Sequence, residues 1–442
     1  MGTINVTGRM RSCNYEMEER YYRSYDKDGI LTEKLEFSKE SDYFDGRYKR
    51  ISKDKGKTWS EWETVFLDSK EARHGAVPGS KEGDEFLCNP FHAGRTVSTY
   101  HEQSGCLLSF NSTFYYLRGH NVGYFDMWDK GEDNVRHHAY FTYKRPDGTE
   151  VTKMFEFEEG GADYDPENPR NPAFLDKNRV IVESITLLPD GDICVELWPT
   201  MTLCCKLAGV DVNTFFPSCP NLQFGLIYAR GHWNPETEDF EFTYSTPIMV
   251  NDLQSSRGMM EPRLTILPNG RWLVVFRGSN LVHEPWNTRI SPAAPGFKWY
   301  TYSDDGGKTF VPPMPWYFDT REVVYSSATI SDFFRSRKNG KLYWIGNIIE
   351  EPWRVQGNHP RWPLQICQVN EEHGYLMKDT LTVIDTIRDD QTSVDLTNFN
   401  LLEDPDTFEL ELRLTKIGIK RENREEEEWY TEAWEYTITF EE

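Results

Sequence analysis

The stretch SDDGGKTF at residues 303–310 repeats the pattern of SKDKGKTW at residues 52–59. Both read Ser-x-Asp-x-Gly-x-Thr followed by an aromatic residue. This pattern predicts a tight turn, because an Asp carboxylate accepts backbone N–H groups, Gly tolerates a positive φ, and the hydroxyls tie the ends together. The aromatic residue can pack beneath the next strand. The two copies therefore indicate a repeated β architecture, in which these stretches have a structural rather than a catalytic role.

Six other segments each read as a β-hairpin, with an apolar run, a short turn and a second apolar run. They begin near residues 21, 91, 183, 261, 327 and 396. The clearest are ESITLLPDGDICVELW, from Glu183, and EPRLTILPNGRWLVVFRG, from Glu261. Six hairpins, each extended by two further strands, predict an all-β six-bladed propeller. The repeated turns would then join the third and fourth strands of blades 1 and 4. A seven-bladed ring also fits the chain length.

We expect residues 1–442 to form one propeller domain whose ends meet. The C-terminal stretch EEWYTEAWEYTITFEE alternates as a strand does, and TINVTG near the N-terminus is a second candidate strand. If these two strands share the last blade, the ring is closed and no sheet edge is left open there.

The composition limits the classes of partner. Aromatic residues make up 14% of the 442 residues, with 14 Trp and 23 Tyr, which favours a β-protein or a sugar-binding protein. The net charge of −23 argues against general binding to nucleic acids or anionic membranes. A local arginine cluster can still bind an anionic small substrate. We expect an oligosaccharide or glycan as the partner, and the composition leaves the oligomeric state open.

The cysteines and the N-terminus bear on the compartment. The eight cysteines form no CxxC pair, which indicates free thiols in a reducing compartment. The opening MGTINVTGRM has no apolar core of a signal peptide, and no run of about 18 apolar residues follows. These observations predict a cytoplasmic protein, or a secreted or periplasmic one if a signal peptide has been removed.

The Ser-x-Asp-x-Gly-x-Thr-aromatic pattern resembles the Asp box of the sialidase (neuraminidase) superfamily. SRGMMEPRLTILPNGRWLVVFRGSN, NGKLYWIGNI and NHPRWPLQI are also similar to Asp-box (BNR-repeat) sialidase-like proteins. The resemblance implies a six-bladed propeller with a substrate pocket where the inner strands converge. Sialidases hold the substrate carboxylate with an arginine triad, and they use a Tyr nucleophile polarised by a Glu and an Asp as acid/base.

This resemblance implies Glu261 as the Glu and Tyr325 as the Tyr. The first blade lacks an Arg-Ile-Pro sequence, so neither the first triad arginine nor the Asp acid/base has a counterpart by motif. The superfamily fold also carries other glycosidases and polysaccharide lyases, and the fold alone does not choose among them.

Most candidate site residues stand near the starts of the inner strands, because in a propeller these positions face the central pocket. Arg277 instead ends the strand that follows, and four further candidates lie in the long, polar and aromatic loop EEPWRVQGNHPRWP. The catalytic candidates are Glu261, Tyr325, His74 and His92. The substrate-binding candidates are Arg73, Arg95, Arg263, Arg277, Trp353, Arg354, His359 and Arg361. Arginines clamp a carboxylate, an aromatic ring stacks on a sugar, and a His or Tyr beside a carboxylate moves protons.

These residues predict an exo-acting glycoside hydrolase that acts on a glycan with a sialic or uronic acid at or near its non-reducing end. Two alternatives remain open. One is a lyase that cleaves at a uronate by β-elimination, for which a His–Tyr–Arg set would serve. The other is a non-catalytic glycan-binding propeller. We expect no cofactor and no metal ion.

Overall fold

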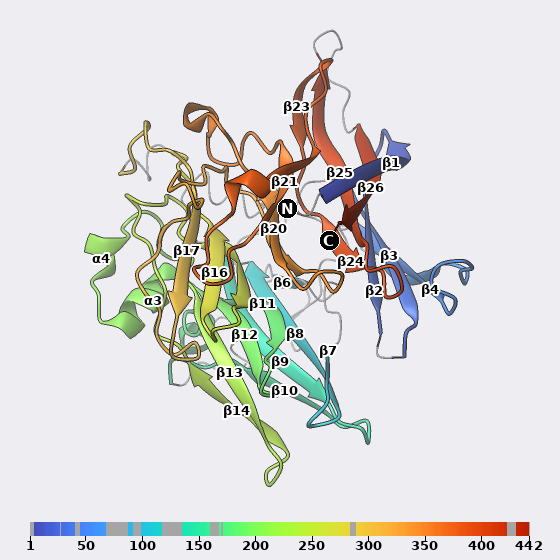
Figure 1. Cartoon of the computed structure of the whole chain (residues 1–442). Coiled ribbons are helices and arrows are strands. Elements are labelled where there is room, and N and C mark those ends of the chain that lie inside the picture. Colours follow the sequence, from blue (N-terminus) through green and yellow to red (C-terminus); the bar gives the residue numbers. More distant parts are fainter. Residues whose placement is uncertain are drawn as a thin grey trace.

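The computed structural model describes residues 4–26, 28–39, 45–67, 87–91, 99–116, 135–159, 168, 171–282, 289–421 and 430–441. Within these ranges the strands form six small antiparallel sheets, arranged as the blades of a six-bladed β-propeller (Figure 1). The expected all-β, six-bladed architecture is confirmed, and the seven-bladed alternative is wrong.

Blades 1 to 3 follow one another along the chain. Blade 1 contains β2 (Glu18–Tyr25), β3 (Leu31–Ser38), β4 (Gly46–Ser52) and β5 (Glu63–Leu67). Blade 2 contains β6 (Leu87–Phe91), β7 (Thr99–His101), β8 (Cys106–Tyr116), β9 (Val135–Lys144) and β10 (Glu150–Met154). Blade 3 contains β11 (Val180–Leu187), β12 (Ile193–Pro199), β13 (Ile227–Asn234) and β14 (Asp239–Tyr244).

Blades 4 to 6 complete the ring. Blade 4 contains β15 (Met260–Ile266), β16 (Trp272–Arg277), β17 (Lys298–Ser303) and β18 (Met314–Pro315). Blade 5 contains β19 (Asp332–Arg335), β20 (Leu342–Asn347), β21 (Leu364–Gln368) and β22 (Thr382–Asp385). Blade 6 contains β23 (Gln391–Asp395), β24 (Asn400–Glu403), β25 (Leu410–Arg421), β26 (Thr431–Phe440) and β1 (Ile4–Asn14).

Short helices lie between the strands. They are α2 (Pro172–Leu175), α3 (Met201–Ala208), α4 (Val212–Phe215), η1 (Pro352–Arg354) and η2 (Lys378–Thr380). The longest of them, α3, begins at the N-cap Thr200, whose side chain accepts from the Leu203 N–H, and ends at Gly209 in the left-handed region.

The expected hairpins coincide with the blades. Each of the six starts, near residues 21, 91, 183, 261, 327 and 396, lies in or just before an inner strand. The chain ends also meet as expected, because β1 pairs with β26 in an antiparallel register from Ile4 opposite Phe440 to Asn14 opposite Thr431. Figure 1 shows the blue β1 beside the red β26, which lies between β1 and β25 in the sheet. The first strand of the chain therefore completes the last blade.

The two repeated turns lie where the sequence predicts them, after β4 in blade 1 and after β17 in blade 4. In the second copy, the Asp305 carboxylate accepts hydrogen bonds from the Thr309 N–H at 3.0 Å and the Thr309 hydroxyl at 2.6 Å. In the first copy, Asp54 accepts the same two bonds from Thr58 at 2.8 and 2.6 Å. The repeated letters thus build the same turn twice.

The two turns differ in the space around their glycine, which is Gly56 in the first turn and Gly307 in the second. Gly56 and Gly307 have φ of 86° and 84°, but a Cβ would lie 3.4 Å from Leu31 in the first turn and 2.5 Å from the Trp272 ring in the second. Gly56→Ala is expected to cost about 1–2 kcal/mol for the left-handed backbone. Gly307→Ala is expected to cost about 1–3 kcal/mol more, because the ring must move. Urea unfolding of the two variants measures the difference, and equal losses would contradict the predicted overlap.

Apolar side chains fill the joints between neighbouring blades. Between blades 3 and 4, for example, Trp198 and Tyr228 belong to one buried cluster with Trp272 and Phe276. Comparable clusters join blades 2 and 3, blades 4 and 5, and blades 5 and 6. Because apolar burial contributes about 25 cal/mol per Å², these joints hold the blades at fixed positions around the axis.

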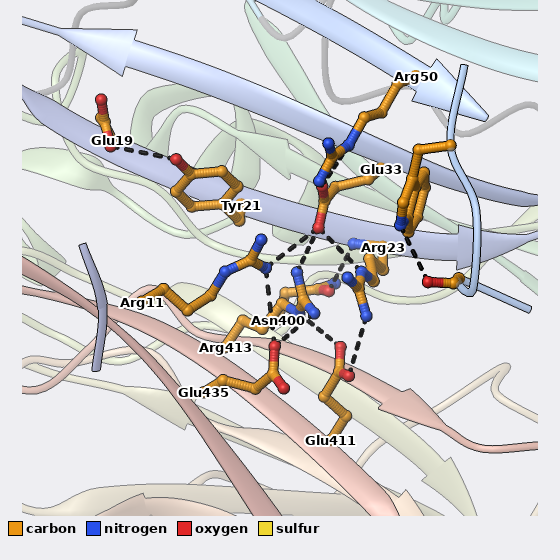
Figure 2. Close-up of polar contacts among 12 residues, drawn as sticks. Arg11, Glu19, Tyr21, Arg23, Glu33, Arg50, Asn400, Glu411, Arg413 and Glu435 are labelled. Atoms are coloured by element: carbon orange, nitrogen blue, oxygen red, sulfur yellow. Dashed lines mark hydrogen bonds and ion pairs between the residues drawn. The ribbon is translucent and has the colours of Figure 1, made fainter. Parts of the chain in front are cut away.

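The joint between blades 6 and 1 contains a charged network, which we call the ring-closing seam (Figure 2). It consists of Arg11, Arg23, Glu33, Arg50, Glu411, Arg413 and Glu435. Glu33 is fully buried on β3 and accepts from Arg413 at 2.6 Å, Arg50 at 2.8 Å, Arg23 at 2.9 Å and Arg11 at 3.1 Å. One carboxylate therefore binds four guanidinium groups drawn from both blades.

Six cysteines that the structure describes are free thiols, namely Cys13, Cys106, Cys194, Cys204, Cys205 and Cys367. Among the described residues, no helix is long and apolar enough to cross a membrane.

Candidate active site

Glu261 lies at an irregular point of the inner strand of blade 4. Pro262 has no N–H to donate to the ladder, and the pairing of β15 with β16 shifts between Met260 and Arg263. Glu261 adopts φ of +48°, a left-handed conformation that is uncommon for residues other than glycine and costs about 1–3 kcal/mol. The bulge turns the carboxylate toward Arg277, whose Nε lies 3.1 Å from Oε2.

Arg277 ends β16 and joins blades 4 and 5. It lies opposite Met260 in the ladder, and its Nη1 donates to the Ala328 carbonyl at 2.9 Å, just before β19. Its side chain is largely buried. The guanidinium is therefore held from two sides, by the Glu261 carboxylate and by a backbone carbonyl of the next blade.

Lys298 is a fully buried cation next to this pair. It is the first residue of β17, lies opposite Arg277 in the ladder, and donates through Nζ to the Thr329 carbonyl. Burial lowers the pKa of Lys298 to about 7 from its ordinary 10.5. Arg277, Arg263 and Arg361 lower this pKa further, whereas Glu261 raises it. The electrostatic potential at Lys298 is thus raised by three guanidinium groups.

The Lys298 pKa predicts a pH-dependent stability. Between about pH 7 and 10.5 the unfolded chain binds more protons than the folded chain at this lysine, so stability rises with pH across this window. Lys298→Met removes the titrating group. The difference in unfolding free energy, wild type minus Lys298→Met, is therefore expected to increase from pH 7 to pH 10, measured by urea unfolding. Lys308→Met, at an exposed position, serves as the control. If the difference in unfolding free energy between wild type and variant stayed constant from pH 7 to pH 10 for both variants, the expectation would be contradicted.

Arg263 faces carboxylates of three blades. Its Nη1 donates to the Pro262 carbonyl at 2.9 Å, and its Nε lies 3.6 Å from Oδ1 of Asp332 at the start of β19. Glu196 and Glu183 of blade 3 and Glu261 of blade 4 also act on it electrostatically. Arg263 therefore lies among the protein's own carboxylates.

His359 and Arg361 meet Asp395 at the junction of blades 5 and 6. The His359 Nδ1 lies 3.5 Å from Oδ1 of Asp395, and the Arg361 Nη1 lies 3.7 Å from Oδ2. Arg361 also donates through Nε to the Asn358 carbonyl at 3.0 Å. The long segment between β20 and β21 therefore reaches β23 of the next blade, and Arg361 also acts electrostatically on Lys298.

Trp353 and Arg354 occupy η1 in the same segment. Trp353 is 73% exposed, the largest exposed fraction among the apolar side chains that the structure describes. Arg354 pairs with Glu351 at 3.1 Å and lies over the Trp362 ring at 4.5 Å. The Trp353 ring thus offers a free aromatic face of the kind that stacks on sugars.

Tyr325 is placed differently from the expectation for a nucleophile paired with Glu261. Its ring stacks on Phe297 with the centroids 5.7 Å apart, and no hydrogen bond joins its hydroxyl to Glu261 in the described part of the chain. The remaining candidates, Arg73, His74, His92 and Arg95, lie outside the described residues, and their roles stay predictions.

Three residues of this region were not predicted from the sequence. Asp332 begins β19, so the rule that residues at the start of an inner strand face the pocket would have found it, whereas Asp395 ends β23 and falls outside that rule. Lys298 begins a third strand, and its sequence context KWYTYS gives no sign of burial. Among the described residues, no group of three or more His, Cys, Asp or Glu side chains is placed to hold a metal ion.

Comparison with known proteins shows the fold. No family model and no curated protein sequence matches this chain. A Dyadobacter fermentans protein of unknown function matches its structure with a TM-score of 0.50 and 12% identity, over 98% of this chain and 99% of that one. The K499G mutant of the NanB sialidase of Streptococcus pneumoniae matches with a TM-score of 0.51 and 10% identity, over 97% of this chain and 70% of that one. The chain has a sialidase-like propeller fold.

Proposed function

We propose that this protein is an exo-acting glycoside hydrolase that acts on a glycan with an acidic sugar at or near its non-reducing end. The observation that carries the proposal is the buried Lys298, which lies opposite Arg277 in the ladder of blade 4 and on which Arg263 and Arg361 also act electrostatically. A sugar carboxylate bound there would add a negative charge to a region of raised potential, which stabilises it.

The proposed roles follow from the contacts. Arg277 and Arg361 would hold the substrate carboxylate, since both present rigid, permanently charged donors. Glu261, held by Arg277 at 3.1 Å, would either transfer a proton in the reaction or polarise the nucleophile. Trp353 would stack on a sugar ring.

We also propose that the turns at Ser52–Trp59 and Ser303–Phe310 are Asp boxes of the sialidase type. The free thiols, we propose, reflect a reducing compartment.

A non-catalytic glycan-binding propeller is the second candidate. It is favoured by one observation, that the Tyr325 hydroxyl does not bond to Glu261, which leaves the expected nucleophile without its partner in the described part of the chain. Such a protein would keep the arginines and Trp353 but would turn over no substrate.

Incubation of the purified protein with sialosides, uronate-capped oligosaccharides and neutral aryl glycosides tests the proposal. We expect sugar release from an acidic substrate without new ultraviolet absorbance. New absorbance of an unsaturated uronate would instead indicate β-elimination, with His74 and His92 as the residues to test. Binding of an acidic glycan without any turnover would indicate the non-catalytic alternative.

A further inference from the structure

A short stretch within the long segment between β20 and β21 is bonded to three blades, and we call residues 357–361 the bridging turn. Its backbone carbonyls accept from the N–H of Ala328, just before β19, at 2.8 Å and from that of Leu396, just after β23, at 2.9 Å. Arg257, just before β15, donates through Nη1 to the side-chain oxygen of Asn358 in the turn at 3.2 Å. The bridging turn therefore connects the inner strands of blades 4, 5 and 6.

Both arginines that would hold the substrate carboxylate are attached to this turn. Arg361 is its last residue. Arg277 is joined to it through Ala328, whose N–H donates to the turn and whose carbonyl accepts from the Arg277 Nη1 at 2.9 Å. A side chain presented by the bridging turn is therefore anchored to the same backbone as the proposed carboxylate site.

His359 is the side chain that the turn presents to solvent. Its backbone is fixed, because its N–H donates to the Gln356 carbonyl at 3.1 Å and its carbonyl accepts from the Gln356 N–H at 2.8 Å. Gly357 has φ of +57°, and a Cβ there would lie 3.0 Å from Leu281, so the turn needs a glycine. The His359 side chain, in contrast, is 63% exposed. A rigid backbone thus holds an accessible imidazole.

The two ring nitrogens of His359 have different surroundings. Nδ1 lies 3.5 Å from Oδ1 of Asp395, whose side chain is only 11% exposed, whereas Nε2 has no partner among the described residues. Arg361 lies 3.7 Å from the other oxygen of Asp395. A carboxylate on one side of an imidazole orients the ring and leaves the second nitrogen free to exchange a proton with a bound molecule.

We propose that His359 is the general acid of the proposed hydrolysis, and that Asp395 is the positioning residue that orients its ring. This role rests on the proposed function, for which no Asp acid/base has a counterpart by motif. Protonated His359 gives its Nε2 proton to the leaving oxygen as the bond between that oxygen and the anomeric carbon breaks. Water then bonds to the anomeric carbon and loses one proton, which returns to Nε2. Glu261 is thereby left to polarise the nucleophile.

The dependence of the rate on the leaving group tests this role. A para-nitrophenolate leaves without being protonated, whereas a methoxide needs a proton from a general acid. We would measure kcat/KM of the whole chain for the methyl and para-nitrophenyl glycosides of N-acetylneuraminic acid and of glucuronic acid. His359→Gln is expected to lower kcat/KM at least about 100-fold for the methyl glycoside that the wild type cleaves, and less than about tenfold for the para-nitrophenyl glycoside of the same sugar. Asp395→Asn is expected to show the same split with a smaller loss.

His373→Gln is the matched control, since His373 is also exposed and its Nε2 lies 3.8 Å from a carboxylate oxygen of Glu372. It should leave kcat/KM for both leaving groups unchanged, and the unfolding midpoint of each variant shows whether it is folded. A wild type that cleaves none of the four glycosides would overturn the proposed hydrolysis, and the role of His359 with it. An active wild type, together with a His359→Gln variant that loses activity equally on both leaving groups or not at all, would overturn the role of His359 alone.

Discussion

Replacement of Glu33 by glutamine is expected to lower the free energy of unfolding by about 3–5 kcal/mol, because loss of one partner leaves buried charges uncompensated. The variant has nearly the same shape but cannot neutralise the four arginines of the ring-closing seam. Arg413 and Arg23, which approach the carboxylate at 2.6 and 2.9 Å, are largely buried and would lose their shared partner.

Urea unfolding followed by tryptophan fluorescence measures this loss. Asp406→Asn is the matched control, since Asp406 pairs with Lys55 across the same two blades but both side chains are exposed. Exposed pairs contribute about 0–1 kcal/mol, so the control should change little. If Glu33→Gln and Asp406→Asn had the same small effect, the seam would not hold the ring closed.

Acid unfolding offers a second measurement on the same variant. Burial would raise the pKa of Glu33, but Arg23, Arg11 and Arg413 outweigh it and lower the pKa to about 2 from 4.5. The stability that Glu33 contributes is therefore complete above about pH 4.5 and is lost as the pH falls toward 2. The wild type should lose more stability in this window than Glu33→Gln does.

Glu261→Gln is expected to lower kcat/KM at least about 100-fold on whichever acidic glycoside the wild type cleaves, which is about 2.7 kcal/mol of transition-state stabilisation. The amide cannot take up a proton or balance the Arg277 charge at 3.1 Å. The loss should fall mainly on kcat if Glu261 acts in the reaction, and mainly on KM if it only orients Arg277 for binding.

The control for this experiment is Glu322→Gln, which removes an exposed carboxylate paired with Lys378. It should leave the kinetic constants unchanged. A Glu261→Gln protein that is folded, by its unfolding midpoint, and as active as the control would exclude Glu261 from the proposed reaction.

The fold could be predicted from the sequence because its signals are local. Each blade begins with a hairpin whose turn residues stand in the sequence, as in LPDG at Leu188–Gly191 and LPNG at Leu267–Gly270. The two Ser-x-Asp turns fix their own hydrogen bonds within eight residues. The closure of the ring by β1 could be predicted because polar and apolar residues alternate at both chain ends, and because an open sheet edge is unfavourable.

The site was predicted only in part, because its partners come from different blades. Glu261 and Arg277 stand at strand ends and were singled out from the sequence, but the pairing of Arg361 with Asp395 depends on how the long segment between β20 and β21 folds. The burial of Lys298 is a tertiary property, since lysines are almost never fully buried and no local pattern marks it. Around Glu33, Arg23 and Arg50 lie opposite it in the ladders of blade 1, whereas Arg11 and Arg413 are brought to it only by the closed ring.

The pairing of β1 with β26 has a consequence during synthesis. The ribosome adds about 5–20 residues per second, so β1 waits roughly 20–80 s after its own synthesis before its partner strand, Thr431–Phe440, is made. Throughout that time its backbone hydrogen-bonding groups are free to pair with another chain. A nascent polypeptide of this kind is therefore exposed to strand exchange between neighbouring ribosomes, and a chaperone that shields residues 4–14 would raise the yield of native protein.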